Sequence, residues 1–159
     1  MQPSDFNALL IEKFPFQPTA SQAVWINEIT EYLFFGDSST IFILKGYAGT
    51  GKSTSIGHLV NFLPKITYRA VLMAPTGRAA KVMSGYAAKK AYTIHKQIYF
   101  TKSEGGSGMK FTLKPNKFKN TLFVVDEASM IGDDRQNTKL FENGSLLGDL
   151  MQYVDAGTN

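Results

Sequence analysis

The feature that most constrains the fold is a glycine-rich segment, GYAGTGKS, at residues 46–53. It matches the pattern G-x-x-x-x-G-K-[ST] at every fixed position, and it stands between an apolar run (residues 41–44) and a helical pattern that Pro64 ends. Glycines let the backbone turn sharply enough for its N–H groups to surround an anion, and the following helix adds its positive N-terminal dipole. Such a match arises by chance about once in a few hundred chains of this length. The segment therefore predicts a phosphate-binding loop.

The same pattern assigns roles to side chains around this loop. We expect Lys52 to reach the β- and γ-phosphates of ATP, and the Ser53 hydroxyl to be a ligand of Mg²⁺. ATP and Mg²⁺ are therefore the expected cofactors. The residues expected to contact the nucleotide through this loop are Gly46, Ala48, Gly49, Thr50, Gly51, Lys52, Ser53 and Thr54.

The order of apolar runs and helical patterns predicts the fold class. Buried strands are expected at residues 41–44, 69–74 and 122–125, because continuous apolar runs are typical of strands covered on both faces. The expected helices are 20–35 (capped by Thr19 and Gln22, stopped by Gly36), the segment from the glycine-rich loop to Pro64, 77 to about 90, 93–100, and 145–156. Strands that alternate with helices predict an α/β domain on a parallel sheet.

One polar segment interrupts this alternation. Residues 101–120 contain a glycine-rich stretch and five lysines, so we expect an exposed loop or hairpin there. The chain has no internal repeat and no dividing linker, which predicts a single domain over residues 1–159.

Composition excludes several classes of protein. The content of 43% hydrophobic and 19% charged residues is typical of a globular domain, and the absence of cysteine rules out disulfides and thiolate chemistry. No apolar stretch is long enough to cross a bilayer and no secretion signal is evident, so we expect a cytoplasmic protein without a membrane partner. The net charge of +4 suits a polyanion but is equally common in other soluble domains.

An acidic pair, Asp126-Glu127, follows the last apolar run. Ligands gather at the carboxyl ends of parallel strands, so Asp126 is expected to hold Mg²⁺ and Glu127 to orient and deprotonate the attacking water. Without the phosphate-binding loop, two solvated carboxylates would be the simpler interpretation. With Lys52, the pair predicts a catalytic set for phosphoryl transfer.

Four separated segments resemble the motifs of superfamily 1 DNA helicases of the RecD/Dda-like group, which includes proteins similar to the exonuclease V alpha subunit. Residues 46–53 resemble motif I, and APTGRAAK at 74–81 resembles motif Ia. TIHK at 93–96 is similar to the short DNA-contacting motif that follows, and VVDEASM at 124–130 resembles motif II. Residues 17–22 resemble the Q motif. The resemblance implies a RecA-like P-loop NTPase domain that drives single-stranded DNA translocation and duplex unwinding with ATP.

The resemblance also implies partners and a DNA track. Single-stranded DNA is the expected partner, with repair or recombination proteins beside it. The track residues it implies are Thr76, Gly77, Arg78, Lys81, Thr93, His95 and Lys96. Hydroxyls, backbone N–H groups and cations of this kind hold phosphates without reading bases. For His95, packing against neighbouring side chains in a helix is an equal alternative to DNA contact. Base stacking is conceivable for three aromatic residues, but core or surface packing is the more common role for them: Tyr92, Tyr99 and Phe100.

Two further expectations come from the family. Its Q-motif glutamine would read adenine N6 and N7, so Gln22 is expected to bind adenine as well as cap its helix. The family continues with a motif III and a second RecA-like domain that carries an arginine finger, and this chain contains neither. None of Arg69, Arg78 and Arg135 is a natural substitute, so the chain by itself is expected to hydrolyse ATP very slowly. The alternatives are another P-loop phosphotransferase, or a nucleotide-dependent DNA-binding module without activity of its own.

Overall fold

The computed structural model describes residues 1–37, 40–100, 111–132 and 140–157. Its backbone divides into two compact units. The first unit comprises Met1–Arg69 with Tyr86–Ala88, and the second comprises Ala70–Gly85 with Lys89–Asn159. Each unit has its own buried residues.

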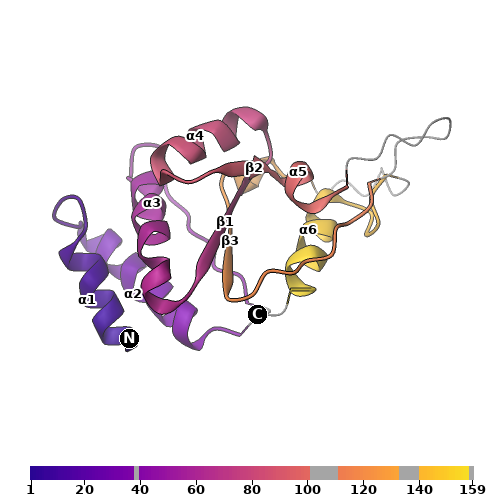
Figure 1. The fold of residues 1–159 in the computed structure, drawn as a ribbon. Coiled ribbons are helices and arrows are strands. Elements are labelled where there is room, and N and C mark those ends of the chain that lie inside the picture. Colours follow the sequence, from indigo (N-terminus) through magenta and orange to yellow (C-terminus); the bar gives the residue numbers. More distant parts are fainter. Residues whose placement is uncertain (38–39, 101–110, 133–139, 158–159) are drawn as a thin grey trace. The chain divides into compact units, whose positions relative to one another are not determined.

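The first unit is built from helices (Figure 1). They are α1 (Pro3–Glu12), α2 (Ala20–Phe35), α3 (Lys52–Phe62) and the short 3₁₀ helix η1 (Leu63–Ile66). Helix α1 contacts both α2 and α3. The buried side chains of this unit include Phe6, Leu10, Trp25, Ile26, Ile29, Leu33, Leu59 and Leu63. Apolar residues at helical spacing thus place one face of each helix in the core.

Helix α2 agrees with its predicted bounds, and α3 ends just before Pro64 as expected. Thr19 caps α2, because its hydroxyl accepts a hydrogen bond from the Gln22 backbone N–H (3.3 Å) while its own N–H donates to Gln22 Oε1 (3.0 Å). Helix α1 was not predicted, and it precedes residues 20–35, the first of the expected helices. Its clearest sequence signal is a proline at the helix start, Pro3, and one such residue does not by itself predict a helix.

The second unit contains a three-stranded sheet in the order β2-β1-β3. Strand β1 (Arg69–Ala74) pairs in parallel with β2 (Ala91–Thr93), and β3 (Thr121–Val125) lies on the other side of β1. The helices are α4 (Gly77–Ala87), α5 (Ile94–Ile98), η2 (Ala128–Met130) and α6 (Leu146–Asp155). A parallel sheet with flanking helices confirms the predicted fold class.

The core of the second unit lies around β1, α5 and α6. Its buried members are Met73, Ile94, Ile98, Tyr99, Leu150 and Tyr153. A polar network supports it, because the fully buried Asp149 carboxylate accepts hydrogen bonds from the Tyr99 hydroxyl (2.7 Å) and from the backbone N–H of Asn143 (2.7 Å). Paired in this way, a buried carboxylate is compatible with an apolar core.

The largest correction concerns residues 41–44, which form no strand. No described strand pairs with this segment, and Ile41 and Ile43 are 59% and 71% exposed. Phe42 is half-buried against Tyr32, with the ring centroids 5.5 Å apart. An apolar run becomes a strand only when a neighbouring backbone supplies hydrogen bonds, and no such neighbour can be read from the run itself.

Smaller differences occur in the second unit. Helix α4 ends at Ala87 rather than near residue 90, because Ala88 takes a left-handed conformation (φ 48°). Helix α5 ends at Ile98, after which Tyr99 is extended and bridges to Leu113. Strand β2 was not predicted, being only three residues long. Of the expected loop or hairpin at 101–120, residues 101–110 lie outside the described residues.

Candidate functional site

The glycine-rich loop has the backbone that its sequence requires. Gly49 and Gly51 have φ values of 79° and 82°, which side-chain-bearing residues rarely adopt. Gly51 is also the N-cap of α3, so the helix starts at Lys52 directly after the loop. Ser53 and Thr54 are exposed in its first turn, as are Gly46, Ala48, Gly49 and Thr50 in the loop. The N–H groups of a helix start are therefore open to an anion.

Lys52 is folded back onto the loop. Its Nζ donates hydrogen bonds to the carbonyl oxygens of Gly46 and Tyr47, the latter at 2.7 Å. The Thr50 hydroxyl also donates to the Tyr47 carbonyl oxygen at 2.8 Å. The ammonium group therefore already lies within the loop. It can exchange two carbonyl oxygens for phosphate oxygens, which are stronger acceptors because they are charged.

Gln22 links α2 to the loop. Its Oε1 accepts the capping hydrogen bond from Thr19, and its Nε2 lies 3.5 Å from the Thr50 carbonyl oxygen. A Cβ atom at Gly51 would stand 2.8 Å from the same Nε2, so a residue larger than glycine there would displace the end of the Gln22 side chain. Both polar atoms of the Gln22 side chain thus have protein partners, and a paired contact with adenine would have to replace them.

The acidic pair follows directly on β3. The Asp126 N–H donates to the Met73 carbonyl oxygen at 3.0 Å, which continues the pairing of β3 with β1. Glu127 is exposed and has a left-handed backbone (φ 53°), a conformation that costs a non-glycine residue on the order of 1 kcal/mol. Its N–H donates to Asp126 Oδ1 at 2.9 Å. Strain of this kind gathers at functional sites, where a side chain must be held in a particular place.

The oxygen donors suit magnesium. An exposed serine hydroxyl (Ser53) and a half-buried carboxylate (Asp126) are hard ligands of the type that Mg²⁺ prefers. Among the described residues no group of three or more His, Cys, Asp or Glu side chains could hold a metal. Mg²⁺ keeps several waters and is usually held by one or two protein oxygens with substrate phosphates, so a single oxygen donor in either unit is compatible with this ion.

Two threonines of the proposed DNA track are helix caps. The Thr76 hydroxyl accepts from the Ala79 N–H and the Thr93 hydroxyl accepts from the Lys96 N–H, both at 3.2 Å. Strands β1 and β2 are parallel, with Ala74 opposite Thr93, so the two caps lie at the same edge of the sheet.

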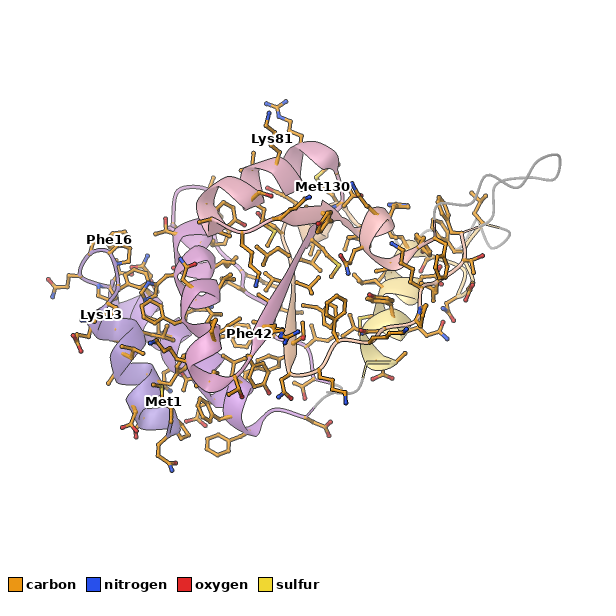
Figure 2. The ribbon with its side chains drawn as sticks, in the orientation of Figure 1. Met1, Lys13, Phe16, Phe42, Lys81 and Met130 are labelled. Atoms are coloured by element: carbon orange, nitrogen blue, oxygen red, sulfur yellow. The ribbon has the colours of Figure 1, made fainter. Side chains whose placement is uncertain are left out.

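Exposed cations accompany these caps. Arg78, Lys81 and Lys96 are all exposed, and Figure 2 shows the Lys81 side chain projecting outward from α4. Gly77, at the start of α4, has open space around the position that a Cβ would take. Hydroxyl groups, cations and an open backbone are thus present at this part of the second unit.

His95 has a packing role. Its ring lies against three aromatic rings, with centroid distances of 5.7 Å to Tyr99, 5.2 Å to Phe111 and 6.4 Å to Phe141. Burial lowers the pKa of His95, so the neutral ring is favoured. Packing of this kind is the alternative that the sequence left open beside DNA contact.

The three aromatic residues considered for base stacking have different environments. Tyr99 is 2% exposed and belongs to the core, whereas Phe100 is 45% exposed. Tyr92 is half-buried, and the Nζ atoms of Lys90 and Lys96 lie 5.2 and 5.5 Å from its ring centroid. Sequence reasoning missed Lys90. Lys90 directly precedes β2 and stands two residues before Tyr92, a spacing that puts two side chains on the same face of an extended backbone.

A family described as AAA domain matches residues 33–158 of the chain. The ATP-dependent RecD2 DNA helicase of Deinococcus radiodurans is 32% identical over 94 residues, which are 58% of this chain and 12% of that protein. The multifunctional conjugation protein TraI of Escherichia coli K12 is 35% identical over 100 residues, 60% of this chain and 5% of that protein. The chain therefore spans a small part of the length of these relatives.

A search of the described helices for membrane spans was negative: none combines the length and the apolar character that crossing a bilayer requires.

Proposed function

The chain belongs to the AAA domain family as a helicase-like P-loop motor domain, and we propose that it couples ATP hydrolysis to translocation on single-stranded DNA and to duplex unwinding. One observation carries this proposal beyond nucleotide binding. On a chain with a phosphate-binding loop, Thr76 and Thr93 cap helices at the same edge of a parallel sheet, beside exposed cations. An enzyme that only transfers phosphate to a small molecule has no use for such a set.

The first step is the binding of ATP by the loop. Backbone N–H groups of residues 46–51 and of the first turn of α3 donate to the phosphate oxygens. Lys52 leaves the Gly46 and Tyr47 carbonyl oxygens and takes the β- and γ-phosphates, and Thr50 and Thr54 line the same loop. Gln22 releases its intramolecular partners to make two hydrogen bonds with adenine.

The second step is hydrolysis. Mg²⁺, when bound, neutralises charge on the β- and γ-phosphates, and Ser53 with Asp126 would hold it. Glu127 accepts a proton from the water that attacks the γ-phosphorus, while the bond to the β-γ bridging oxygen breaks and ADP leaves. An exposed, conformationally held carboxylate suits this role.

The third component is the DNA track. The Thr76 and Thr93 hydroxyls keep a proton to donate to phosphate, and Arg78, Lys81 and Lys96 supply positive charge. The Gly77 backbone and His95 complete the proposed set. Contacts to phosphate position a strand without reading its sequence, which suits a motor that must pass any base.

The rate of hydrolysis depends on a cation that stabilises the developing charge. Loss of an arginine finger costs on the order of 10³–10⁵ in rate in P-loop enzymes, so we expect this chain by itself to hydrolyse ATP slowly. A second RecA-like domain is the partner that would supply the finger. We further propose action in the cytoplasm, with repair or recombination proteins as partners.

Calorimetry with Mg²⁺-ATP tests the nucleotide site. Lys52→Ala should weaken binding by at least about tenfold, because it removes the charged contact to the phosphates, while the thermal melt stays nearly unchanged. Lys65→Ala, an exposed lysine on η1 of the same unit, is the matched control and should bind like the unmodified chain. Equal affinity of the Lys52 and Lys65 variants would contradict the assignment.

DNA binding at low salt tests the track. The Arg78→Ala, Lys81→Ala double variant should bind an oligonucleotide more weakly and with a smaller salt slope than the unmodified chain. The Lys13→Ala, Lys65→Ala double variant removes the same charge from the first unit and serves as control. ATP binding without any DNA binding would favour the phosphotransferase alternative. Binding of both ligands with no measurable ATP turnover, in the unmodified chain as in Glu127→Gln, would favour the inactive binding module.

A further inference from the structure

We infer that Tyr92, with Lys90 and Lys96 beside its ring, is a stacking site for one base of single-stranded DNA. The inference rests on the proposed DNA track and adds to it a contact with a base rather than with phosphate. The Nζ atoms of Lys90 and Lys96 lie 5.2 and 5.5 Å from the ring centroid, within the range of cation–π interactions. The ring is half-buried and both lysines are exposed, so the cluster is open to a ligand.

The fold brings these three residues together. Tyr92 lies on β2, an edge strand of the sheet, and Lys90 directly precedes that strand, two residues before Tyr92. Lys96 comes from α5, whose start is fixed by the Thr93 cap. The backbone of Lys96 is held as well, because Lys114 Nζ donates to the Lys96 carbonyl oxygen at 2.7 Å. Hydrogen bonds therefore fix the Lys96 backbone at both its N–H group and its carbonyl oxygen.

The charge of the cluster indicates the class of ligand. Two like charges converge on one ring, and the one ion pair among the described residues, Lys13–Glu12, is elsewhere. Cation–π contacts at exposed sites are weak, whereas an ammonium group binds a phosphate oxygen more strongly. The phosphates of a DNA strand can bind both ammonium groups while one of its bases stacks on the Tyr92 ring.

The aromatic face of Tyr92 favours single-stranded DNA over other polyanions. An acidic peptide would satisfy the lysines and leave the aromatic face without use. A duplex keeps its base faces stacked on one another, whereas an unpaired base has a free face for Tyr92. Tyr92 directly precedes Thr93 in the chain, so the stacking site is next in sequence to a residue of the proposed phosphate track.

Fluorescence anisotropy at low salt tests the inference with two labelled oligonucleotides of equal length, an oligothymidylate and its abasic counterpart. The unmodified chain should prefer the oligothymidylate. Tyr92→Leu should lower that affinity by about tenfold, a typical effect for one lost base stack, and leave the abasic affinity unchanged. Tyr92→Phe keeps the ring and should keep the preference. Phe100→Leu, which removes an exposed aromatic side chain of the same unit, should change neither affinity.

Lysine variants separate charge from stacking. Lys90→Gln and Lys96→Gln should each weaken binding of both oligonucleotides and reduce the salt slope by roughly 0.7. If Tyr92→Leu does not fold by circular dichroism, Tyr92→Trp serves instead, and its fluorescence should be quenched by the oligothymidylate but not by the abasic strand.

Three results would overturn the inference. One is an equal loss for both oligonucleotides in Tyr92→Leu, or equal quenching by both in Tyr92→Trp. A second is binding of poly-glutamate as tight as that of oligothymidylate and equally dependent on Tyr92, which would point to an acidic protein. A third is equal binding of both oligonucleotides by the unmodified chain, which would leave the phosphate track intact and remove only the stacking site. Failure to bind either oligonucleotide would instead overturn the DNA track of the proposed function.

Discussion

Residues 41–44 and 121–125 have nearly the same sequence character, and the structure treats them differently. Both are short apolar runs that precede a proposed functional motif, the glycine-rich loop in one case and Asp126-Glu127 in the other. Residues 121–125 form β3, which lies beside β1 in the sheet. Residues 41–44 form no strand, and their isoleucines are exposed. The difference teaches that hydrophobicity identifies a candidate strand, whereas a neighbouring backbone decides whether it becomes one.

The two segments also differ in what surrounds them. The unit that contains β3 has a buried carboxylate, Asp149 of α6. It accepts hydrogen bonds from the Tyr99 hydroxyl and from the backbone N–H groups of residues 142 and 143. Residues 41–44 have one aromatic contact, between Phe42 and Tyr32, whose hydroxyl also donates to the Thr40 carbonyl oxygen at 2.9 Å. We therefore expect substitutions around β3 to cost far more stability than substitutions in residues 41–44.

Asp149→Ala should have the largest effect, about 3 kcal/mol or more of unfolding free energy. It removes a fully buried acceptor of hydrogen bonds from Tyr99, Glu142 and Asn143, and leaves their donors unsatisfied. Burial first, and then the Asp149 contact, raises the pKa of Tyr99, so this hydroxyl remains a donor at neutral pH. Urea unfolding followed by circular dichroism measures the loss. A loss below about 1 kcal/mol would show that the network contributes little to the second unit.

Phe123→Ala and Ile43→Ala test the two apolar runs directly. Phe123 packs edge-on against Phe118 and Tyr153, with centroid distances of 5.7 and 6.0 Å, so its truncation should cost about 2–3 kcal/mol. Ile43 is 71% exposed, and its truncation should change stability by less than about 0.5 kcal/mol. Equal costs in urea unfolding would mean that residues 41–44 are packed as a strand in solution.

Acidification should lower the stability of both units, because each contains one histidine whose pKa is lowered in the folded state. Burial lowers the pKa of His58 and of His95, although the hydrogen bond between His58 Nε2 and the Leu10 carbonyl oxygen (2.8 Å) partly opposes the effect at His58. A lowered pKa means that the unfolded chain binds protons first. Stability should therefore be constant above the ordinary histidine pKa of about 6.5 and fall as the pH drops below it.

Urea midpoints between pH 7.5 and 5 measure this dependence. His58→Gln should flatten it for the first unit, observed through the fluorescence of the single tryptophan, Trp25, which is buried there. His95→Gln should leave the Trp25 signal unchanged and flatten the dependence observed by near-ultraviolet circular dichroism. A steep dependence that persists in the double variant would assign the effect to carboxylates instead.

Thr19→Ala should cost about 1 kcal/mol, less than Asp149→Ala or Phe123→Ala, because it removes only the cap of α2. Thr19→Ser keeps the hydroxyl and should restore most of the loss. The urea midpoint from Trp25 fluorescence measures both. The variant also tests whether the capping arrangement positions Gln22 beside the loop, since ATP affinity should fall with it. Unchanged stability would mean that the Gln22 side chain alone secures the helix start.

Local patterns were sufficient for the elements whose signals are complete within a few residues. The glycine-rich loop with a helix after it, the Thr19 cap and the strand before Asp126 were all predicted, because backbone conformation and capping depend on neighbouring residues. The resemblance to superfamily 1 helicases came from the same short segments. The roles of the site residues stay predictions.

Tertiary structure decided what depends on residues far apart in the chain. No local pattern could show that residues 41–44 lack a pairing strand, that His95 is surrounded by aromatic rings, or that Asp149 is buried under Tyr99. The same holds for Tyr92 on β2, whose two lysines come from the residue before that strand and from α5. Pairing, burial and charge clustering are properties of contacts between distant segments, and a contact is set by the whole fold rather than by the residues that make it.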